Sequence, residues 1–370
     1  MALASFYNMI KSICVVRLSA LGDVLMLVPL IRTLQAGFPE ARITWVISRP
    51  AYDLVEGMDN IEFVVIDKPD SLADYWRFNK QFKHRKFDVL LAAQASFRAN
   101  LLYPLIRAKR KIGYDSLRAK DGHGLFVGER ISAGNDHTLE GFLKFAEPLG
   151  LTNKNLRWDL PIDEVSHAWA RKHLEGNESV LLVNPAASKP ERSWPVARYV
   201  EVIKHAQATW NLTVVLVGGP GPFDRELADA ILAEVSCLDL VGKTKPKQLL
   251  ALISQARLVL CPDTGPSHMA AAVGTPVVAL HAVTSSDVSG PYTFRHLAVD
   301  CYPQAVETVL KKTGATNVWG THAHGDRTME LVTVDAVINK LSEALAQQVR
   351  GRLPICILPF TDYSIKATDF

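Results

Sequence analysis

Short apolar runs alternate with longer, partly polar segments along the first hundred residues. The apolar runs are rich in branched side chains and short enough for buried β-strands, and the segments between them carry helical periodicity. The predicted strands cover residues 12–18, 43–48, 62–67 and 88–94. The predicted helices cover residues 22–36, 50–57 and 71–85. Alternation of this kind indicates a parallel sheet flanked by helices.

The pattern breaks at residues 151–167, which are polar and resemble a linker, and then it starts again. The second set of predicted strands covers residues 180–186, 212–219, 258–261 and 277–280. The second set of predicted helices covers residues 195–209, 222–235, 246–256 and 334–349, the last one capped by Thr333. We therefore predict an α/β fold of two βα domains that meet at a cleft. The domains cover residues 1–160 and 168–345, and a tail follows at 346–370.

One stretch, CPDTGPSHMAAAVGTPVVAL at 261–280, places a polar loop and a short helix between two of these strands. Gly265 and Pro266 read as a helix start, which Thr264 or Ser267 is expected to cap, and Gly274 ends the helix. The backbone amides at such a helix start suit an anion such as a phosphate. In open α/β sheets, ligands bind beyond the carboxyl ends of the strands, where this loop lies.

The composition fits a soluble globular protein. Of its 370 residues, 48% are hydrophobic and 21% are charged, and no apolar run reaches the roughly 18 residues that span a bilayer. The N-terminus lacks the charged start and cleavage site of a signal peptide. The five cysteines are widely scattered, without a CxxC pair. This spacing indicates neither a zinc site nor a disulfide framework, so we expect a reducing cytoplasm.

The net charge of +3 is unevenly distributed. Residues 77–120 hold twelve lysines and arginines but only two acids. This stretch is either a solvated basic face or a surface for a polyanion such as a phosphorylated lipid, a nucleic acid or a membrane. Since no aromatic-rich RNA motif or DNA-binding module accompanies it, we do not expect a nucleic-acid partner.

Several chemistries are poorly supported. The sequence has no P-loop and no HExxH, and its first strand is followed by RLSALGDVL rather than GxGxxG. His322 and His324 fit a surface loop better than a metal site. Asp23 follows the first strand, at the expected cleft. There it is either a helix cap or a general base toward a hydroxyl group.

Three segments together resemble glycosyltransferase family 9, typified by the ADP-heptose:lipopolysaccharide heptosyltransferases. They are RLSALGDVLMLVPLIRTLQAGFPEARITWVI, SKPERSWPVARYVEVI and PDTGPSHMAAAVGTPVVAL, in the order of the family. The resemblance implies a GT-B fold of two Rossmann-like domains. It also implies transfer of a heptose from ADP-heptose to the inner core of lipopolysaccharide, on a lipid A–Kdo acceptor, with inversion. The nucleotide-sugar is expected in the second domain and the acceptor in the first.

The same resemblance assigns roles to individual residues. Asp23 matches the proposed general base, and no metal or other cofactor is implied. The expected donor-binding residues are Ser188, Arg192, Thr244, Asp263, Thr264, Gly265, Pro266 and His268. The acceptor or the inner face of the cytoplasmic membrane is expected to contact Arg98, Lys109, Arg110 and Lys111, which lie in the basic stretch. This places the protein in the cytoplasm, peripherally on the membrane.

Less specific interpretations stay open beside these. Asp263 can simply brace its loop, and His268 can be an ordinary first-turn histidine. After residue 280 many family members read FGPT, whereas this chain reads HAVTSS, with Thr284 keeping the pattern. Two other functions remain open. One is an enzyme of the same fold that uses another nucleotide-sugar, as a transferase, epimerase or hydrolase. The other is a nucleotide-sugar binding protein without activity.

Overall fold

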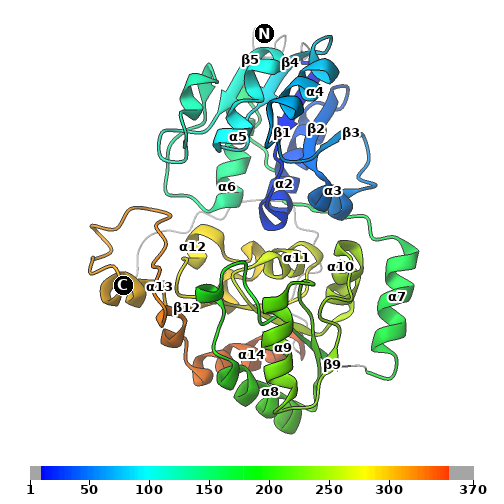
Figure 1. Ribbon diagram of the computed structural model, residues 1–370. Coiled ribbons are helices and arrows are strands. Elements are labelled where there is room, and N and C mark those ends of the chain that lie inside the picture. Colours follow the sequence, from blue (N-terminus) through cyan, green and yellow to red (C-terminus); the bar gives the residue numbers. More distant parts are fainter. Residues whose placement is uncertain (1–9, 178, 350–370) are drawn as a thin grey trace.

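The computed structural model describes residues 10–177 and 179–349. Over these residues the strands form two parallel sheets of six strands each, with helices on both faces (Figure 1). This is the GT-B arrangement expected from the sequence. The predicted tail lies outside the described residues from position 350 onward.

The first sheet has the strand order β3-β2-β1-β4-β5-β6. Its strands are β1 (Ser12–Val16), β2 (Arg42–Ser48), β3 (Ile61–Ile66), β4 (Lys86–Leu91), β5 (Arg107–Gly113) and β6 (Glu129–Arg130). The helices that accompany this sheet are α2 (Leu21–Gly37), α3 (Arg49–Val55), α4 (Leu72–Phe82), α5 (Phe97–Asn100) and α6 (Thr138–Leu143). We call this sheet with its helices the first half, and the second sheet with its helices the second half. Short 3-10 turns are η1 (Tyr103–Leu105), η2 (His123–Leu125) and η3 (Lys144–Leu149).

The second sheet has the order β12-β11-β10-β7-β8-β9. Its strands are β7 (Val180–Val183), β8 (Thr213–Leu216), β9 (Leu238–Asp239), β10 (Leu258–Pro262), β11 (Val277–His281) and β12 (Val299–Asp300). The helices are α7 (Glu164–Leu174), α8 (Val196–Trp210), α9 (Pro222–Leu232), α10 (Pro246–Gln255), α11 (Gly265–Val273), α12 (Ser286–Ser289), α13 (Tyr302–Thr308) and α14 (Val334–Val349). The 3-10 turns are η4 (Pro190–Arg192), η5 (Tyr292–Leu297) and η6 (Thr328–Leu331).

Both sheets reverse their direction of growth at one point. The chain builds β1, β2 and β3 outward on one side, then returns to add β4 next to β1; β7 and β10 are neighbours in the same way. At such a point the loops after the two neighbouring strands separate and leave a crevice for a ligand. The loops after β1 and after β10 therefore begin the helices that face each other, α2 and α11 (Figure 1).

Helix α2 is apolar nearly all round because it is covered on several sides. It packs against α6 and α11, and its buried residues include Val24, Leu27 and Leu34. The linker adds a further cover: Trp158 Nε1 donates to the Leu25 carbonyl at 2.8 Å. A helix that is hydrophobic on all faces is a buried helix. The first turn of α2 is thereby fixed in place beside the second sheet.

Several elements differ from the sequence prediction, and helix α7 and strand β5 illustrate the reasons. Helix α7 begins at Glu164, inside the predicted linker, and its N-cap Asp163 accepts a hydrogen bond from the Ser166 amide at 2.8 Å. Only three of its residues are buried, so its apolar period is weak. Strand β5, RAKRKIG, was not predicted because lysine and arginine fill it. It pairs with β4 and β6, and Lys109, Arg110 and Lys111 each have a partner within the protein.

Hydrogen bonds join the two halves close to the crevice. His137 donates through Nε2 to the Gly290 carbonyl at 2.9 Å, and Thr138 donates to the Val288 carbonyl at 2.8 Å. Because His137 Nδ1 accepts from the Leu139 amide at 3.1 Å, the ring proton lies on Nε2. Burial lowers the pKa of His137 to about 3, so this ring is neutral at pH 7.

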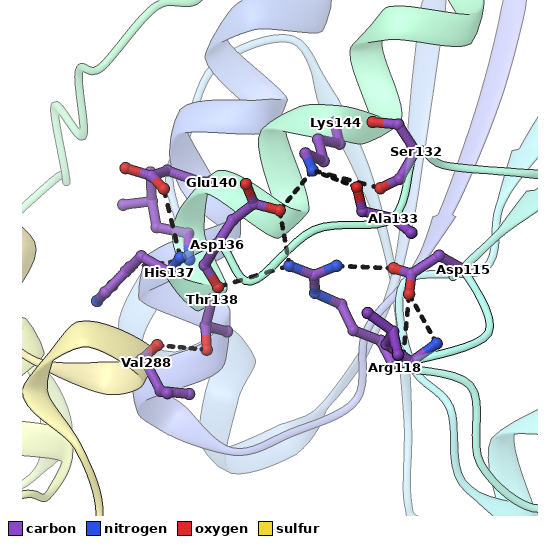
Figure 2. A network of polar contacts seen from close by, with 12 residues as sticks. Asp115, Arg118, Ser132, Ala133, Asp136, His137, Thr138, Glu140, Lys144 and Val288 are labelled. Atoms are coloured by element: carbon purple, nitrogen blue, oxygen red, sulfur yellow. Dashed lines mark hydrogen bonds and ion pairs between the residues drawn. The ribbon is translucent and has the colours of Figure 1, made fainter. Parts of the chain in front are cut away.

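An ion-pair network supports the segment that makes these contacts. Figure 2 shows Arg118 between the carboxylates of Asp115 and Asp136, at 2.7 and 2.9 Å, with Lys144 also paired to Asp136. Arg118 also reaches the Asp136 carbonyl at 3.5 Å. The network fixes the residue immediately before His137. By fixing Asp136, the network holds the following residues of the first half where they contact α12 of the second half.

No helix in the part of the chain that the structure describes combines the length and hydropathy needed to cross a membrane.

Candidate functional site

A cavity of about 700 Å³ lies between the carboxyl ends of the two sheets. From the first half it is lined by Ala20, Leu21, Gly22, Asp23, Met26, Lys120 and Thr138. From the second half it is lined by Ser188, Arg192, Asp263, Thr264, Gly265, Pro266, His268, Thr284, Ser285, Val288, Ser289, Gly320, Thr321 and His322. The cavity thus brings together Asp23 and seven of the eight residues expected to bind the donor.

Asp23 projects from the first turn of α2 into this cavity. Its Oδ2 accepts a hydrogen bond from the Ala20 amide at 3.0 Å and forms an ion pair with Arg17. Arg17 in turn donates to the Ala93 carbonyl at 2.9 Å, and its guanidinium lies over the Phe142 ring at 5.2 Å. Asp23 is therefore a helix cap and a cavity carboxylate at once. The cap orients it rather than removing it from the site.

The ion pair also sets the charge state around Asp23. Burial alone would lower the pKa of Arg17, but the neighbouring Asp23 carboxylate outweighs this and raises it. Arg17 is thus a permanent cation beside Asp23. The Asp23 side chain keeps 29% of its surface exposed, so it is open to a ligand in the cavity.

Asp263 lies on the other side of the cavity, directly after β10. Its Oδ2 accepts from Arg192 Nη2 at 2.7 Å, from the Thr284 hydroxyl at 2.7 Å and from the Ser289 hydroxyl at 3.1 Å. Burial would raise the pKa of Asp263, but the nearby His281 and Arg192 charges and these hydrogen bonds together lower it. The carboxylate therefore stays ionised and braces the loop.

Arg192 is fixed by Asp263 but keeps donors for a ligand. Its Nη2 is used twice, toward Asp263 Oδ2 and toward the Asp263 carbonyl at 2.6 Å. Its Nη1 makes a long contact of 3.5 Å with the Ser188 hydroxyl. A guanidinium has five N–H donors, so it can serve an anion in the cavity while it holds the loop.

The N-terminus of α11 opens onto the cavity between these groups. The expectation that Thr264 or Ser267 caps this helix is wrong: the N-cap Thr264 makes no side-chain capping hydrogen bond, and the Ser267 hydroxyl instead donates to the Thr264 carbonyl at 2.7 Å. Thr264, Gly265 and Pro266 line the cavity. An uncapped helix N-terminus presents amide donors and a partial positive charge, which favour an anion.

His268 occupies the contact between the two halves, one turn into α11. It is buried, and a Cβ atom placed on Gly22 would lie 2.4 Å from its Cδ2. Burial lowers the pKa of His268, although the Asp263 and Asp23 carboxylates oppose the shift. The ring is therefore neutral at pH 7 and lies next to the first turn that carries Asp23.

Comparison with known proteins agrees with this geometry. A sequence profile described as "Glycosyltransferase family 9 (heptosyltransferase)" matches residues 75–314. The lipopolysaccharide core heptosyltransferase OpsX of Haemophilus influenzae is 33% identical over 336 residues, which is 90% of this chain and 96% of OpsX. The chain belongs to glycosyltransferase family 9.

Solved structures support the fold of this glycosyltransferase. A family 9 glycosyl transferase from Veillonella parvula superposes with a TM-score of 0.74 at 22% identity, covering 91% of this chain and 97% of that one. The E. coli heptosyltransferase WaaC, solved with ADP, has a TM-score of 0.64 at 19% identity over 90% of this chain and all of its own. At such low identity these likenesses show the GT-B fold.

Some predicted site residues lie away from the glycosyltransferase cavity. Thr244, in the loop between β9 and α10, is outside its lining. So are Arg98 on α5 and Lys109, Arg110 and Lys111, three of the four basic residues of β5. Lys109 pairs with Asp88 at 2.8 Å. Lys111 donates to the Tyr103 carbonyl at 2.7 Å. The roles of these residues toward donor or acceptor stay predictions.

Arg110, the third basic residue of β5, is bound within the protein as well. It forms two hydrogen bonds with Glu129, at 2.7 and 2.5 Å, and donates to the Pro148 carbonyl at 2.8 Å. Since Arg110 and Lys111 hold β5 to its neighbours, replacing them would disturb the sheet. They are poor probes of acceptor or membrane contact.

Other cavity residues were missed or read differently in the sequence. His322 lies in an exposed loop, as expected, but it also forms part of the cavity wall, and Lys120 and Ser289 line the cavity as well. All three come from segments without a recognisable motif. Within residues 10–177 and 179–349, no three histidine, cysteine or acidic side chains are grouped as a metal site would require.

The crowding at Gly22 gives a testable prediction. Gly22→Ala should reduce the free energy of unfolding of the glycosyltransferase by about 1–3 kcal/mol, because the new methyl group overlaps the buried His268 ring. Urea denaturation measures the change. Gly265→Ala is the matched control, since a Cβ there meets only Leu21 Cβ, at 3.8 Å. If both variants were equally stable, the close contact between α2 and α11 would be absent in solution.

Proposed function

We propose that this glycosyltransferase moves a heptose from ADP-heptose to the inner core of lipopolysaccharide. One observation carries the proposal: a single cavity holds a carboxylate from the first half opposite a guanidinium and an open helix N-terminus from the second. Such a pair of sites suits a reaction in which a hydroxyl loses a proton while a diphosphate leaves. The 33% identity to OpsX, a lipopolysaccharide core heptosyltransferase by name, supports the choice of sugar and acceptor.

In this proposal Asp23 acts as the general base. It accepts the proton of an acceptor hydroxyl as the hydroxyl oxygen forms a bond to the anomeric carbon of heptose. The bond from that carbon to the β-phosphate oxygen breaks at the same time, and ADP leaves with the bonding electrons. Attack from the face opposite the leaving group inverts the anomeric configuration. The proton on Asp23 then passes to solvent.

Arg192 and the amides at the start of α11 are proposed to bind the departing diphosphate. Both are preorganised, because Asp263 Oδ2 pairs with Arg192 Nη2 at 2.7 Å and so fixes the guanidinium beside the helix start. Donors that are already in place at the site of developing charge lower a barrier without reorganisation. We therefore propose that no metal ion or other cofactor is needed, since the protein supplies the positive charge.

We further propose a cytoplasmic enzyme that works peripherally on the inner membrane, with no nucleic-acid partner. A lipid-linked acceptor confines the reaction to a membrane surface. Lys120, at the edge of the cavity on the acceptor side, fits an anionic core sugar. The basic stretch 77–120 is consistent with an anionic surface nearby.

The test is a transfer assay with purified enzyme, ADP-heptose and a Kdo-lipid A acceptor, followed by mass spectrometry. The expected product is the acceptor with one added heptose, formed equally well in EDTA. Product formed only from another nucleotide-sugar would correct the donor. Release of free heptose without transfer would indicate a hydrolase. ADP binding with neither transfer nor release of heptose would indicate a nucleotide-sugar binding protein without activity. Loss of activity in EDTA would refute the metal-independent mechanism.

A further inference from the structure

Exposed apolar side chains gather at one edge of the first half. Among the residues that the structure describes, eight large apolar side chains are exposed, and five of them lie beyond the carboxyl ends of β3, β4 and β5. We call these five the apolar rim. They are Leu72, Trp76, Phe97, Leu117 and Leu125, with exposed fractions between 60% and 88%.

The segments that carry the rim are tied into one surface. The Tyr75 hydroxyl on α4 donates to the Arg98 carbonyl on α5 at 3.1 Å. The Phe97 amide on α5 donates to Asp121 Oδ2 at 2.9 Å, in the loop that holds Leu117 and Leu125. The side-chain amide of Asn100 donates two further hydrogen bonds to carbonyls of that loop, at 3.1 and 3.0 Å. The rim is therefore held together by hydrogen bonds between its segments.

Helix α4 anchors itself to the core with other side chains than the exposed Leu72 and Trp76. Its inner face buries Phe78 and Phe82 in the core. Leu72, Trp76 and Lys80 are spaced four residues apart and so form a stripe along one face. Leu72 and Trp76 are exposed, and the Lys80 ammonium lies 5.5 Å from the Trp76 ring. Exposed apolar groups grouped in this way mark an interaction surface.

Basic side chains accompany the rim. Arg77, Lys80, Arg98 and Lys120 are all exposed and belong to the same segments. Of the acids among them, Asp74 pairs with Arg77, and Asp121 accepts from the Phe97 amide. The surface therefore combines aromatic and aliphatic groups with an excess of positive charge. This is the combination that binds the interface of an anionic bilayer.

The rim is continuous with the cavity. Lys120 lines the main cavity and also a neighbouring hollow of about 340 Å³, which Leu125 lines as well. A bilayer that touches the rim would thus bring its protruding head groups to the acceptor side of the cavity. An apolar protein interface has no need of this continuity or of the positive charge.

We propose that the apolar rim is the surface by which this enzyme docks on an anionic lipid bilayer, with Trp76, Phe97 and Leu125 entering the interface. This deepens the proposed function, on which it rests for the lipid-linked acceptor. It assigns membrane contact to the segments at the edge of the cleft, and not to the basic strand β5, where Arg110 and Lys111 have partners within the protein.

The test uses vesicles of phosphatidylglycerol and phosphatidylethanolamine with the full chain in a co-sedimentation assay. The triple variant Trp76→Ser, Phe97→Ser, Leu125→Ser should bind at least about tenfold more weakly than the wild type, because each lost side chain removes apolar area from the interface. The matched control is Val165→Ser, Leu238→Ser, Val318→Ser, which replaces the three exposed apolar residues outside the rim. It should bind like the wild type. Circular dichroism verifies that both triple variants are folded.

Three further readouts decide between sources of binding. The tryptophan fluorescence of the wild type should shift to the blue and be quenched by brominated lipid, and the rim variant, which lacks Trp76, should not show this change. Part of the binding should survive high salt, which removes only the ionic contribution. Equal binding by the rim variant and the wild type, or equal loss in the control, would overturn the proposal. So would a wild-type dimer that the rim variant dissociates, since the rim would then be a protein interface.

Failure of this inference can be told apart from failure of the proposed function. ADP affinity and transfer to a deacylated, water-soluble acceptor depend on the cavity and not on the rim. Both should be unchanged in the rim variant. If they were lost together with vesicle binding, the rim would be part of the active site, and the docking proposal would be wrong.

Discussion

Asp23→Asn is expected to lower turnover by about 10²-fold or more, the range for loss of a general base. The side-chain carbonyl oxygen of the variant can still accept the hydrogen bond from the Ala20 backbone amide, which caps α2. The side chain cannot, however, take a proton from the acceptor hydroxyl. Steady-state kinetics with saturating donor and acceptor would measure the loss. ADP affinity, determined by calorimetry, should stay close to the wild-type value because the donor site is proposed to lie on the other half.

A control must separate proton transfer from the support that Asp23 gives to Arg17. Arg17→Gln removes the same ion pair and leaves the carboxylate in place. If Asp23 served only to neutralise the buried Arg17, both variants would lose turnover and stability to a similar extent. If Asp23 is the base, Asp23→Asn is much slower than Arg17→Gln. Near-wild-type turnover of folded Asp23→Asn would remove this residue from the mechanism.

Arg192→Ala is expected to weaken ADP binding by about ten- to a hundred-fold. A charge-assisted hydrogen bond to the diphosphate contributes roughly 1.5–3 kcal/mol, and each 1.4 kcal/mol is about a factor of ten in affinity. Isothermal titration with ADP and with ADP-heptose measures the change. Acceptor affinity should hardly change, since the acceptor is expected on the first half.

The Arg192–Asp263 pair complicates this experiment, and two variants resolve it. Asp263→Asn removes the brace and leaves the guanidinium, whereas Arg192→Lys keeps the charge but loses the planar fork. If Arg192 acts only by bracing the loop, Asp263→Asn reproduces its whole effect on ADP. Direct contact predicts a larger loss for Arg192→Ala than for Asp263→Asn, with partial recovery in Arg192→Lys. Normal ADP binding with lost acceptor affinity would reverse the assignment of the two halves.

Much of the fold could be predicted because buried parallel strands are apolar on both faces. Such strands read as continuous runs of branched residues, and β7 and β10 were recognised for this reason. Strand β5 could not be recognised in the same way. It lies near the sheet edge, and its charges are offset by Asp88 and Glu129, residues that the sequence places far from it. The pattern of residues within β5 gives no indication of these ion pairs.

The residues of the candidate site also differ in whether a local pattern could predict them. Asp23, Asp263 and the start of α11 directly follow strands, so the rule that ligands bind at the carboxyl ends of strands places them in the cleft. Lys120 and His322 lie on loops with no periodicity, and only the folded chain brings them to the same cavity. For the basic residues of β5, a count of charges could not show the carboxylates and carbonyls that the fold supplies as their partners.

The hydrogen bonds between the halves mostly end on backbone carbonyls. His137 and Thr138 donate to the carbonyls of Gly290 and Val288, and Lys247 donates to that of Glu56. A carbonyl is present whatever side chain its residue carries. These contacts therefore tolerate sequence drift at the accepting positions, because the side chains there can change without loss of the hydrogen bond. Under the proposed division of acceptor and donor between the halves, the enzyme is suited to chimaeras in which the two halves come from different relatives, provided that the close contact of Gly22 with His268 is kept.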